Sequence, residues 1–287
     1  MKISRLKDRF IHGVLRRPTP EQKFFSKTLD HRIDEVTSLY SDKKKRERMK
    51  GYFDRTPEQI RNEMQHNFRL FYDFLLGYSQ MTNPQATMQL GCFVATELQW
   101  LRHNGLGGRL VAADHSKDYL RFLESGFSKT AFSGFEFRSF NLDRPRPENF
   151  AGIEMVTAMA VLSNVQPESM DALFASMSSA GVRIVLVGDM YVAQSLSGNT
   201  DSLRSYPLTG SRNWAHPYRA LGRKHGYDAV FIPDFTYSSF KEARGIFALT
   251  QGFDAAATRA AAGHAMDHYL ARQDECWDAF ETSSAGR

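Results

Sequence analysis

The sequence predicts an α/β protein with a Rossmann-like, seven-stranded sheet, mostly parallel with a C-terminal antiparallel hairpin, plus an N-terminal helical extension and a C-terminal helix. From residue 86 onward, short apolar runs rich in β-forming residues alternate with helical stretches. The runs are almost continuously apolar, as expected of parallel strands that are covered on both faces. Only about eight residues join the last two runs, a link that favours an antiparallel hairpin over another crossover.

The N-terminal part, residues 1–82, is predicted to be a helical extension or lid. Thr56, Pro57 and, three residues after the threonine, Gln59 form a helix start signal with a capping box. Apolar residues at spacings of three and four follow it, namely Ile60, Met64, Phe68, Phe71, Phe74 and Leu75. This stripe is expected to pack on the main domain or to cover the mouth of its site.

Seven runs are predicted to be the strands of one domain, residues 83–252. The first five are residues 86–91, 109–114, 135–140, 154–162 and 182–189, and the hairpin consists of residues 227–235 and 244–251. Helices lie between the first five runs, and one of them begins at Pro167 and is ended by Gly181. Repeated strand, helix and strand implies right-handed crossovers and therefore a parallel sheet.

Two segments break this rhythm. Residues 190–214 form a long polar loop, and long loops in compact domains are usually functional lids or disordered. Residues 253–287 are Ala-rich and amphipathic and are predicted to form the C-terminal helix. His264 and His268 share one face of that helix at a metal-ligand spacing, but no third ligand is in register, so no metal site is predicted.

The composition is that of a folded protein without a membrane span. Hydrophobic residues make up 42% and aromatic residues 13% of the chain, enough for a substantial core. No run of about 18 apolar residues and no secretory signal pattern is found. The two cysteines, Cys92 and Cys276, make neither a disulfide framework nor a zinc cluster, so a cytoplasmic location is expected.

Positive charge is concentrated near the N-terminus. Residues 1–72 carry 18 Lys and Arg against 10 Asp and Glu, a net +8, whereas the rest of the chain carries 19 against 22, a net −3. The densest run is "SDKKKRERMK" at residues 41–50. Such a run can attract nucleic acid or an anionic membrane surface, and the favoured alternative is a solvated helix face, since Asp42 and Glu47 interrupt it.

A ligand site is predicted where the first two strands end, because ligands of open parallel sheets bind beyond the carboxyl ends of the strands. Gly91 stands where the first strand must turn toward a helix without a Cβ in the way, and this turn offers backbone N–H groups. Asp114 ends the second strand about twenty residues later, where a carboxylate can accept both hydroxyls of a ribose. This pairing is typical of NAD sites and of S-adenosylmethionine sites alike.

The first loop distinguishes these two cofactors. Residues 91–96, "GCFVAT", keep only the first glycine of the G-x-G-x-x-G pattern on which a dinucleotide pyrophosphate rests. With "MQLGCFVAT", "VAADHSKDYL" and "MVTAMAVLSNVQPESMDALFASMSSAGVRIVLVGD", residues 86–250 resemble the class I S-adenosylmethionine-dependent methyltransferases, with no subfamily indicated. The sequence departs from the family at Gln89, where the first motif has an acid, and at Phe93 and Ala95, where it has glycines.

The resemblance implies S-adenosylmethionine as the cofactor and assigns residues to it. Those expected around its methionine portion and ribose are Gln89, Gly91, Cys92, Phe93, Asp114, His115 and Ser116. Those expected around adenine and under the sulfonium are Asn141, Leu142, Asp143 and the stretch from Ala160 to Asn164. The alternatives are that Asp114 is an exposed strand-end residue and that Asn141 forms a turn.

A general base is expected on the acceptor side. Methyl transfer from a sulfonium is an in-line displacement in which the protein aligns the acceptor and, for a hydroxyl, removes its proton. The candidates, at the ends of the fourth and fifth strands or in and after the long loop, are Asp189, Tyr191, His216 and Tyr218. His216 is favoured because an imidazole is near half-protonated around neutral pH, and its alternative role is a hydrogen-bonded residue at a helix start.

The predicted function is O-methylation of a small molecule or of a sugar or glycan hydroxyl. No Asn/Asp-Pro-Pro-aromatic stretch for gripping the amino group of a base is found, and neither cysteine follows a proline as a pyrimidine-attacking nucleophile would. Two alternatives stay open. One is a nucleic-acid methyltransferase that uses the basic N-terminal region, and the other is a non-catalytic module whose helical additions form a homodimer.

Overall fold

The computed structural model describes residues 23–24, 26–40, 56, 59, 66–127, 134–191, 205–207, 213–233 and 243–252, and the single positions 256, 259, 260, 263 and 267. Several expectations concern residues outside these ranges. They are the basic run 41–50, most of the polar loop 190–214, the two histidines His264 and His268, Cys276 and most of the C-terminal helix. The division of the chain at residues 82 and 252 therefore stays a prediction.

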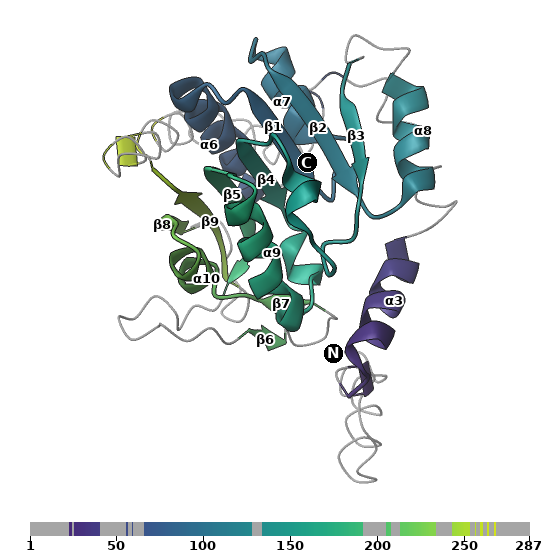
Figure 1. Cartoon of the computed structure of the whole chain (residues 1–287). Coiled ribbons are helices and arrows are strands. Elements are labelled where there is room, and N and C mark those ends of the chain that lie inside the picture. The colour runs from purple at the N-terminus through teal and green to yellow at the C-terminus, as the bar shows by residue number, and fades with distance from the viewer. Residues whose placement is uncertain are drawn as a thin grey trace, which may run out of the picture.

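A seven-stranded mixed sheet forms the centre of the molecule (Figure 1). Its strands are β1 (Ala86–Leu90), β2 (Arg109–Asp114), β3 (Glu136–Ser139), β4 (Met155–Met159), β5 (Ile184–Tyr191), β8 (Asp228–Pro233) and β9 (Ala243–Thr250). Their order across the sheet is β3-β2-β1-β4-β5-β9-β8. Strand β9 runs antiparallel to both of its neighbours, whereas β1 to β5 are mutually parallel. The predicted fold class, with its C-terminal antiparallel hairpin, is confirmed.

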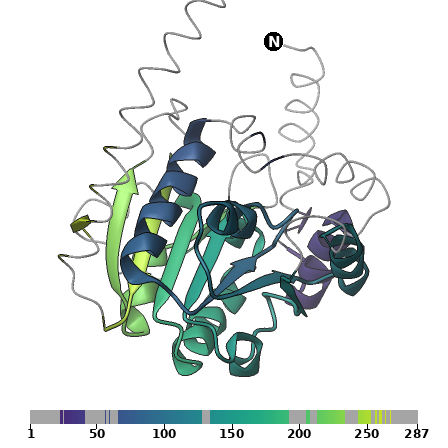
Figure 2. The same ribbon diagram turned by 90° about the horizontal axis from the view of Figure 1, so that it is seen from above.

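Helices cover both faces of the sheet, as the continuous apolar strands predict. On one face lie α6 (His66–Thr82), α7 (Thr96–His103) and α8 (Lys117–Phe127), and on the other lie α9 (Pro167–Ser179) and α10 (Tyr218–Lys224). Successive side chains of β4 point to opposite faces of the sheet. Met155 therefore packs with α6 on one face, and Val156 packs with α9 on the other. Figure 2 shows α6, in dark blue, lying along its face of the sheet.

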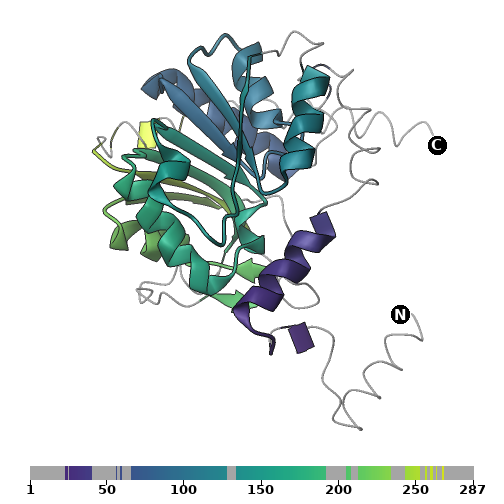
Figure 3. The same cartoon turned by 45° about the vertical axis from the view of Figure 1, so that its right-hand side comes forward.

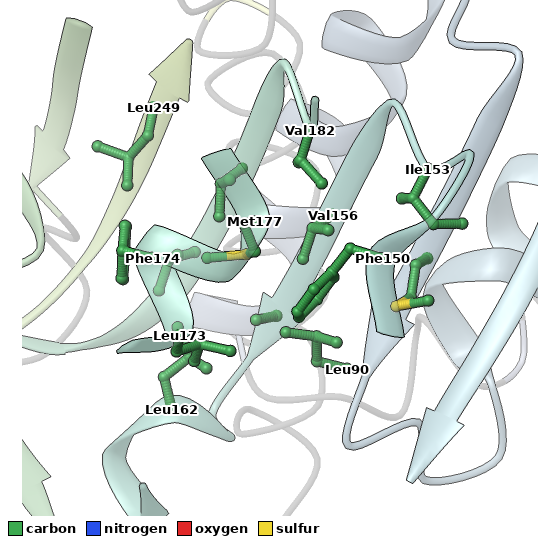
Figure 4. Packing of buried hydrophobic residues seen from close by; sticks show 14 of the residues in the cluster. Leu90, Phe150, Ile153, Val156, Leu162, Leu173, Phe174, Met177, Val182 and Leu249 are labelled. Atoms are coloured by element: carbon green, nitrogen blue, oxygen red, sulfur yellow. The ribbon is translucent and has the colours of Figure 1, made fainter. Parts of the chain in front are cut away.

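The largest apolar cluster lies between the sheet and α9 (Figure 4). Leu173, Phe174 and Met177 of α9 meet Val156 of β4 there. Phe150, from the short 3₁₀ helix η1 (Pro147–Phe150), fills the adjoining space and is fully buried. Full burial of side chains of this size contributes roughly 2 kcal/mol each, so this layer contributes strongly to the stability of the fold.

The other face is covered by the apolar stripe of α6. Phe71, Phe74 and Leu75 are buried against β4, β5 and β9, so this part of the predicted stripe is confirmed as core. Gly188 of β5 has no side chain because a Cβ there would lie 2.6 Å from the ring of Phe71. The stripe therefore packs on a face of the sheet; its first members, Ile60, Met64 and Phe68, have side chains outside the described part.

The predicted helix start at Thr56 is confirmed by its hydrogen bonds. The backbone N–H of Thr56 donates to Gln59 Oε1 at 2.8 Å, and the backbone N–H of Gln59 donates to Thr56 Oγ1 at 3.2 Å. These two bonds are the reciprocal pair of a capping box. Across the described residues, no helix has the length and apolarity that crossing a bilayer requires.

Helix α3 (Leu29–Tyr40) lies next to the start of α9 (Figure 3). The Arg32 guanidinium of α3 is almost completely buried, pairs with Glu168 and stands 5.9 Å from the centroid of the Trp214 ring. Trp214 belongs to a small second sheet formed by β6 (Tyr206–Pro207) and β7 (Trp214–Ala215). Because α9 begins just after β4 ends, α3 and this small sheet lie beyond the carboxyl ends of the central strands.

Candidate functional site

Gly91 and Asp114 lie side by side, as the sequence predicts. Leu90 and Ala113, the residues that precede them, are register partners in the parallel pair β1 and β2. The backbone N–H of Cys92 donates to the carbonyl of Ala113 at 3.0 Å, which fastens the loop after β1 to the end of β2. A turn without a Cβ and a carboxylate therefore emerge together at the carboxyl edge of the sheet.

The loop from Gly91 to Ala95 has an alternating backbone conformation. Gly91, Phe93 and Ala95 all have positive φ angles, at 57°, 46° and 54°. Only glycine adopts this left-handed region without cost, and other residues pay roughly 1–2 kcal/mol there. The loop thus keeps a glycine-type conformation at the two positions where its glycines are replaced, which sequence composition alone does not indicate.

Gly91 is fixed by its neighbour as well as by its backbone angle. A Cβ at this position would lie 2.2 Å from Cγ2 of Val161, the residue that follows β4 by two positions. Real Cβ atoms essentially never approach another heavy atom so closely. The loop after β1 and the segment after β4 are therefore in direct contact at Gly91.

Asp114 is a buried strand-end residue, contrary to the alternative of an exposed one. Its Oδ1 accepts from the backbone N–H of Ser116 at 3.1 Å and lies 3.1 Å from Nδ1 of His115. The side chain of Asp114 is only 5% exposed. A ribose can therefore reach both carboxylate oxygens only if the side chains around Asp114 move.

Phe93, Cys92 and Gln89 lie inside or behind the loop. The Tyr119 hydroxyl of α8 donates to the carbonyl of Phe93, and Cys92 is fully buried in an apolar cluster between α7 and α8. Gln89 is buried at the end of β1, and its Nε2 donates to the carbonyl of Cys92 at 3.2 Å and to the carboxylate of Glu97. Glu97 was not predicted from the sequence, although an acid at the start of the helix after this loop was a visible signal.

The segment after β3 forms a turn. Asn141 Oδ1 accepts a hydrogen bond from the backbone N–H of Asp143 at 2.9 Å. This bond is typical of a turn-forming asparagine, the alternative role considered for Asn141. Asp143 Oδ1 accepts in turn from the backbone N–H of Gln166 at 2.6 Å, at the start of α9, and burial raises the pKa of this carboxyl. Leu142 packs against the large apolar cluster. The assignment of this turn to adenine stays a prediction.

The segment after β4 begins with another left-handed residue. Ala160 has φ 54°, is exposed, and donates its N–H to the carbonyl of Gly188 at 2.8 Å. Further along, Asn213 Nδ2 donates to Ser163 Oγ at 3.3 Å and to Asn164 Oδ1 at 3.4 Å. This group of polar side chains lies between the end of β4 and the start of β7.

Replacing Ala160 by glycine should stabilise the protein. The exposed methyl group of Ala160 makes little packing contribution, so the change mainly removes the cost of a left-handed alanine. Glycine also has more conformational freedom than alanine in the unfolded chain, which offsets part of this gain. The net effect should be an increase of roughly 0.5–1 kcal/mol in the free energy of unfolding. Ala151→Gly is the matched control, because Ala151 is also exposed but has φ −54°, and it should lose a similar amount. Urea denaturation measures both, and equal losses would contradict the strain at Ala160.

Three of the four candidate bases, Asp189, Tyr191 and Tyr218, lie at the end of β5 and the start of α10. Asp189 is buried, and its Oδ2 accepts from the backbone N–H of Ser163 at 2.9 Å. The hydroxyl of Tyr218 is buried as well, and burial together with the nearby Asp189 raises its pKa well above the usual value. Tyr218 is therefore neutral at physiological pH and does not act as a base. Tyr191 belongs to β5, but its side chain lies outside the described part.

The expectation of a half-protonated His216 is wrong. Its ring is fully buried, and burial lowers its pKa to about 4. Nε2 lies 3.1 Å from each of the carbonyl oxygens of Leu162 and Val165, so this nitrogen carries the proton and donates it to them. Nδ1 then accepts from Ser205 Oγ at 2.7 Å. His216 therefore has the alternative role, that of a neutral, hydrogen-bonded residue near the start of a helix. Its hydrogen bonds connect the segment after β4 with the segment before α10.

The structural role of His216 gives a testable pH effect. Its folded pKa lies below the unfolded one, so the stability it contributes is present above about pH 6.5 and is lost as the pH falls toward 4. The full shift corresponds to roughly 3 kcal/mol at most. His216→Gln should remove this part of the acid sensitivity, measured as the difference in unfolding free energy between the variant and the wild type. If the difference in unfolding free energy between His216→Gln and the wild type is the same at every pH from about 6.5 to 4, the pKa of the imidazole is not lowered in the folded protein.

The described residues include no group of three or more His, Cys, Asp or Glu that could hold a metal ion. The described polar groups of the site lie in the loop after β1, at Asp114, in the segment after β4 and at Asp189 near the end of β5. Of the ionisable side chains that the structure describes there, Cys92, Asp114 and Asp189 are all buried.

Comparison with known proteins identifies the fold. No protein-family model and no curated protein matches the sequence. The methyltransferase domain of bacterial CtHen1-CN aligns with a TM-score of 0.50 at 13% identity, over 64% of this chain and 99% of that chain. Magnesium protoporphyrin IX methyltransferase (ChlM) from Synechocystis PCC 6803, solved with bound SAH, aligns with a TM-score of 0.47 at 13% identity, over 87% and 100%.

A S-adenosylmethionine-dependent methyltransferase from Clostridium acetobutylicum ATCC 824 aligns with a TM-score of 0.47 at 10% identity, over 67% of this chain and 95% of that chain. The match to the CtHen1-CN domain and the strand order β3-β2-β1-β4-β5-β9-β8 establish that the chain has the fold of the class I S-adenosylmethionine-dependent methyltransferases. At these identities the likeness establishes the fold alone.

Proposed function

We propose that the protein is an S-adenosylmethionine-dependent methyltransferase. The observation that carries the proposal is the pairing of Gly91 with Asp114 at the carboxyl edge of the sheet, next to a loop that keeps glycine-type angles at residues 93 and 95. Residues other than glycine keep such strained angles only where the surrounding structure holds them, and positions of this kind cluster at functional sites. The likeness of the fold to the methyltransferase domain of bacterial CtHen1-CN supports the choice of cofactor.

The residues at this edge would hold an adenosyl amino acid once Val161 and the side chains around Asp114 move aside. Gly91 has no Cβ on the side that faces the segment after β4. Asp114 offers a carboxylate for the ribose hydroxyls. Asn141 and Leu142 would border adenine, and Ala160 to Asn164 would border the sulfonium. When bound, the cofactor supplies an activated methyl group with an excellent leaving group, so the chain has only to align the acceptor and accept its proton.

On the acceptor side, the proposal is O-methylation of a small molecule or of a sugar or glycan hydroxyl. A hydroxyl acceptor needs a base. Among the candidates whose side chains the structure describes, Asp189 remains, since Tyr218 stays protonated and the Nε2 proton of His216 is donated to two carbonyls. Asn213, Ser163 and Asn164 lie at the same end of the sheet and can supply hydrogen bonds to a polar acceptor.

Isothermal titration calorimetry with S-adenosylhomocysteine and S-adenosylmethionine tests the proposal. We expect micromolar binding of both ligands, which corresponds to about −8 kcal/mol. The absence of detectable heat for either ligand at millimolar concentration would refute it and favour a non-catalytic module. If binding is found, binding of RNA that weakens steeply with added salt would favour the nucleic-acid alternative over a small acceptor.

A further inference from the structure

A buried acid lies directly behind the loop from Gly91 to Ala95. Glu97 is in the first turn of α7, is 1% exposed, and accepts hydrogen bonds from Gln89 Nε2 and from Thr96 Oγ1, the latter at 3.0 Å. The same Nε2 of Gln89 also donates to the carbonyl of Cys92 at 3.2 Å. A continuous chain of contacts therefore runs from the Glu97 carboxyl through the Gln89 amide into the loop.

This chain connects two unusual features of the sequence. Position 89 has an amide in place of an acid, and the loop that follows holds Phe93 and Ala95 in left-handed angles without the help of glycine. Residues other than glycine keep such angles only where contacts with the surrounding structure hold the backbone in place. The bond from Gln89 to the Cys92 carbonyl restrains the loop between Gly91 and Phe93, and the Glu97 carboxyl in turn fixes the orientation of the Gln89 amide.

We propose that Glu97 is a positioning residue that holds the Gly91–Ala95 loop through the Gln89 amide, and that it supplies from α7 the carboxylate that the end of β1 lacks. The link to ligand binding rests on the proposed function, because it requires that this loop hold the cofactor. The link between Glu97 and the loop itself does not.

The surroundings of Glu97 make this link dependent on pH. Burial raises the pKa of Glu97 to about 7, although the bonds from its own backbone, Thr96 and Gln89 act against this. Tyr72 of α6 is the titratable group against it, and its own pKa is raised by burial and by Glu97. Gln89 of β1 is neutral, and no Lys, Arg or His in the described part of the chain forms an ion pair with Glu97. Glu97 therefore changes charge near neutral pH.

Two consequences have opposite signs. An ionised Glu97 accepts a stronger, charge-assisted bond from Gln89 and tightens the loop as the pH rises through about 7. Because its folded pKa lies above the unfolded one, the contribution of Glu97 to global stability is fully present below about pH 4.5 and is lost as the pH rises through about 7. A carboxyl that only filled space in the core would show the second effect without the first.

The first experiment needs no ligand. We expect the backbone amide resonances of residues 91–95, followed by ¹H–¹⁵N NMR from about pH 5.5 to about pH 8.5, to titrate together with a midpoint of about 7. Glu97→Gln, which is neutral and of the same shape, should abolish this titration, and the exchange Gln89→Glu with Glu97→Gln should restore it. Glu124→Gln on the exposed face of α8 is the control and should change nothing. Loop amides that do not titrate in the wild type, or that still titrate in Glu97→Gln, would overturn the proposal.

The second experiment measures S-adenosylhomocysteine affinity across the same range. We expect the wild type to gain about tenfold from the acid to the alkaline end, the effect of one charge-assisted hydrogen bond, and Glu97→Gln to show a flat profile. A wild type that binds the ligand with no pH dependence would contradict the role of Glu97 in binding. A wild type that binds no ligand, while its loop amides still titrate, would refute the proposed function and leave the positioning role intact.

Discussion

Gly91→Ala should cost at least about 2 kcal/mol of the free energy of unfolding and reduce cofactor affinity by tenfold or more. Two causes act together. The new Cβ would lie 2.2 Å from Val161 Cγ2, and an alanine would have to adopt a φ angle of 57°. Either the loop or the segment after β4 must then move, and both border the proposed cofactor position. Urea denaturation and calorimetry with S-adenosylhomocysteine measure the two effects.

Two companion variants make this result specific. Gly107→Ala places a Cβ where no atom lies within 4 Å and where φ is not positive, so it should leave stability and affinity nearly unchanged. Combining Gly91→Ala with Val161→Ala removes the methyl group at 2.2 Å and leaves the Cβ of residue 161 at 3.0 Å, so part of the loss should return. A Gly91→Ala protein with wild-type affinity would show that this loop does not approach the ligand.

Asp114→Asn should weaken S-adenosylhomocysteine binding by about 1–3 kcal/mol, because a charged acceptor for the ribose hydroxyls becomes a neutral one. The asparagine keeps an oxygen for the backbone N–H of Ser116, so the turn after β2 should survive. Calorimetry gives the affinity, and thermal unfolding confirms that the fold is retained.

Asp118→Asn is the matched control for this variant. Asp118 lies four residues further along, in the first turn of α8, and its exposed side chain pairs with Arg121 at 3.1 Å. An exposed pair of this kind contributes little, so the control should bind as the wild type does. If Asp114→Asn binds equally well, Asp114 does not contact the ribose, and its carboxylate serves only to hold Ser116 and His115.

The architecture was predictable because its signals are local. Continuous apolar runs mark strands that are buried on both faces, and the short link before residue 244 marks the reversed strand β9. The adjacency of Gly91 and Asp114 follows from the topology, since successive parallel strands bring their carboxyl ends to one edge. The capping box at Thr56 was likewise readable, because its spacing is itself the signal.

The chemistry of individual side chains was less predictable because it depends on burial across the fold. His216 follows the long loop in sequence, a position typical of an exposed base, yet two carbonyls after β4 surround its Nε2. Glu97 looks like an ordinary acid in the first turn of a helix, and only its burial against Gln89 makes it unusual. In both cases the partner belongs to a different element of the fold, and the sequence around the residue does not specify that the two side chains are buried together.

A crystal structure of the complex with S-adenosylhomocysteine tests the central claim most directly. We expect the ribose hydroxyls to bind Asp114 and the sulfur to lie between Gly91 and the segment beginning at Ala160. Val161, which contacts Gly91 in the free protein, and the side chains around Asp114 should have moved to admit the ligand. A ligand bound on another face of the protein, or crystals grown in saturating ligand with Val161 and Asp114 unchanged and no ligand between them, would contradict it.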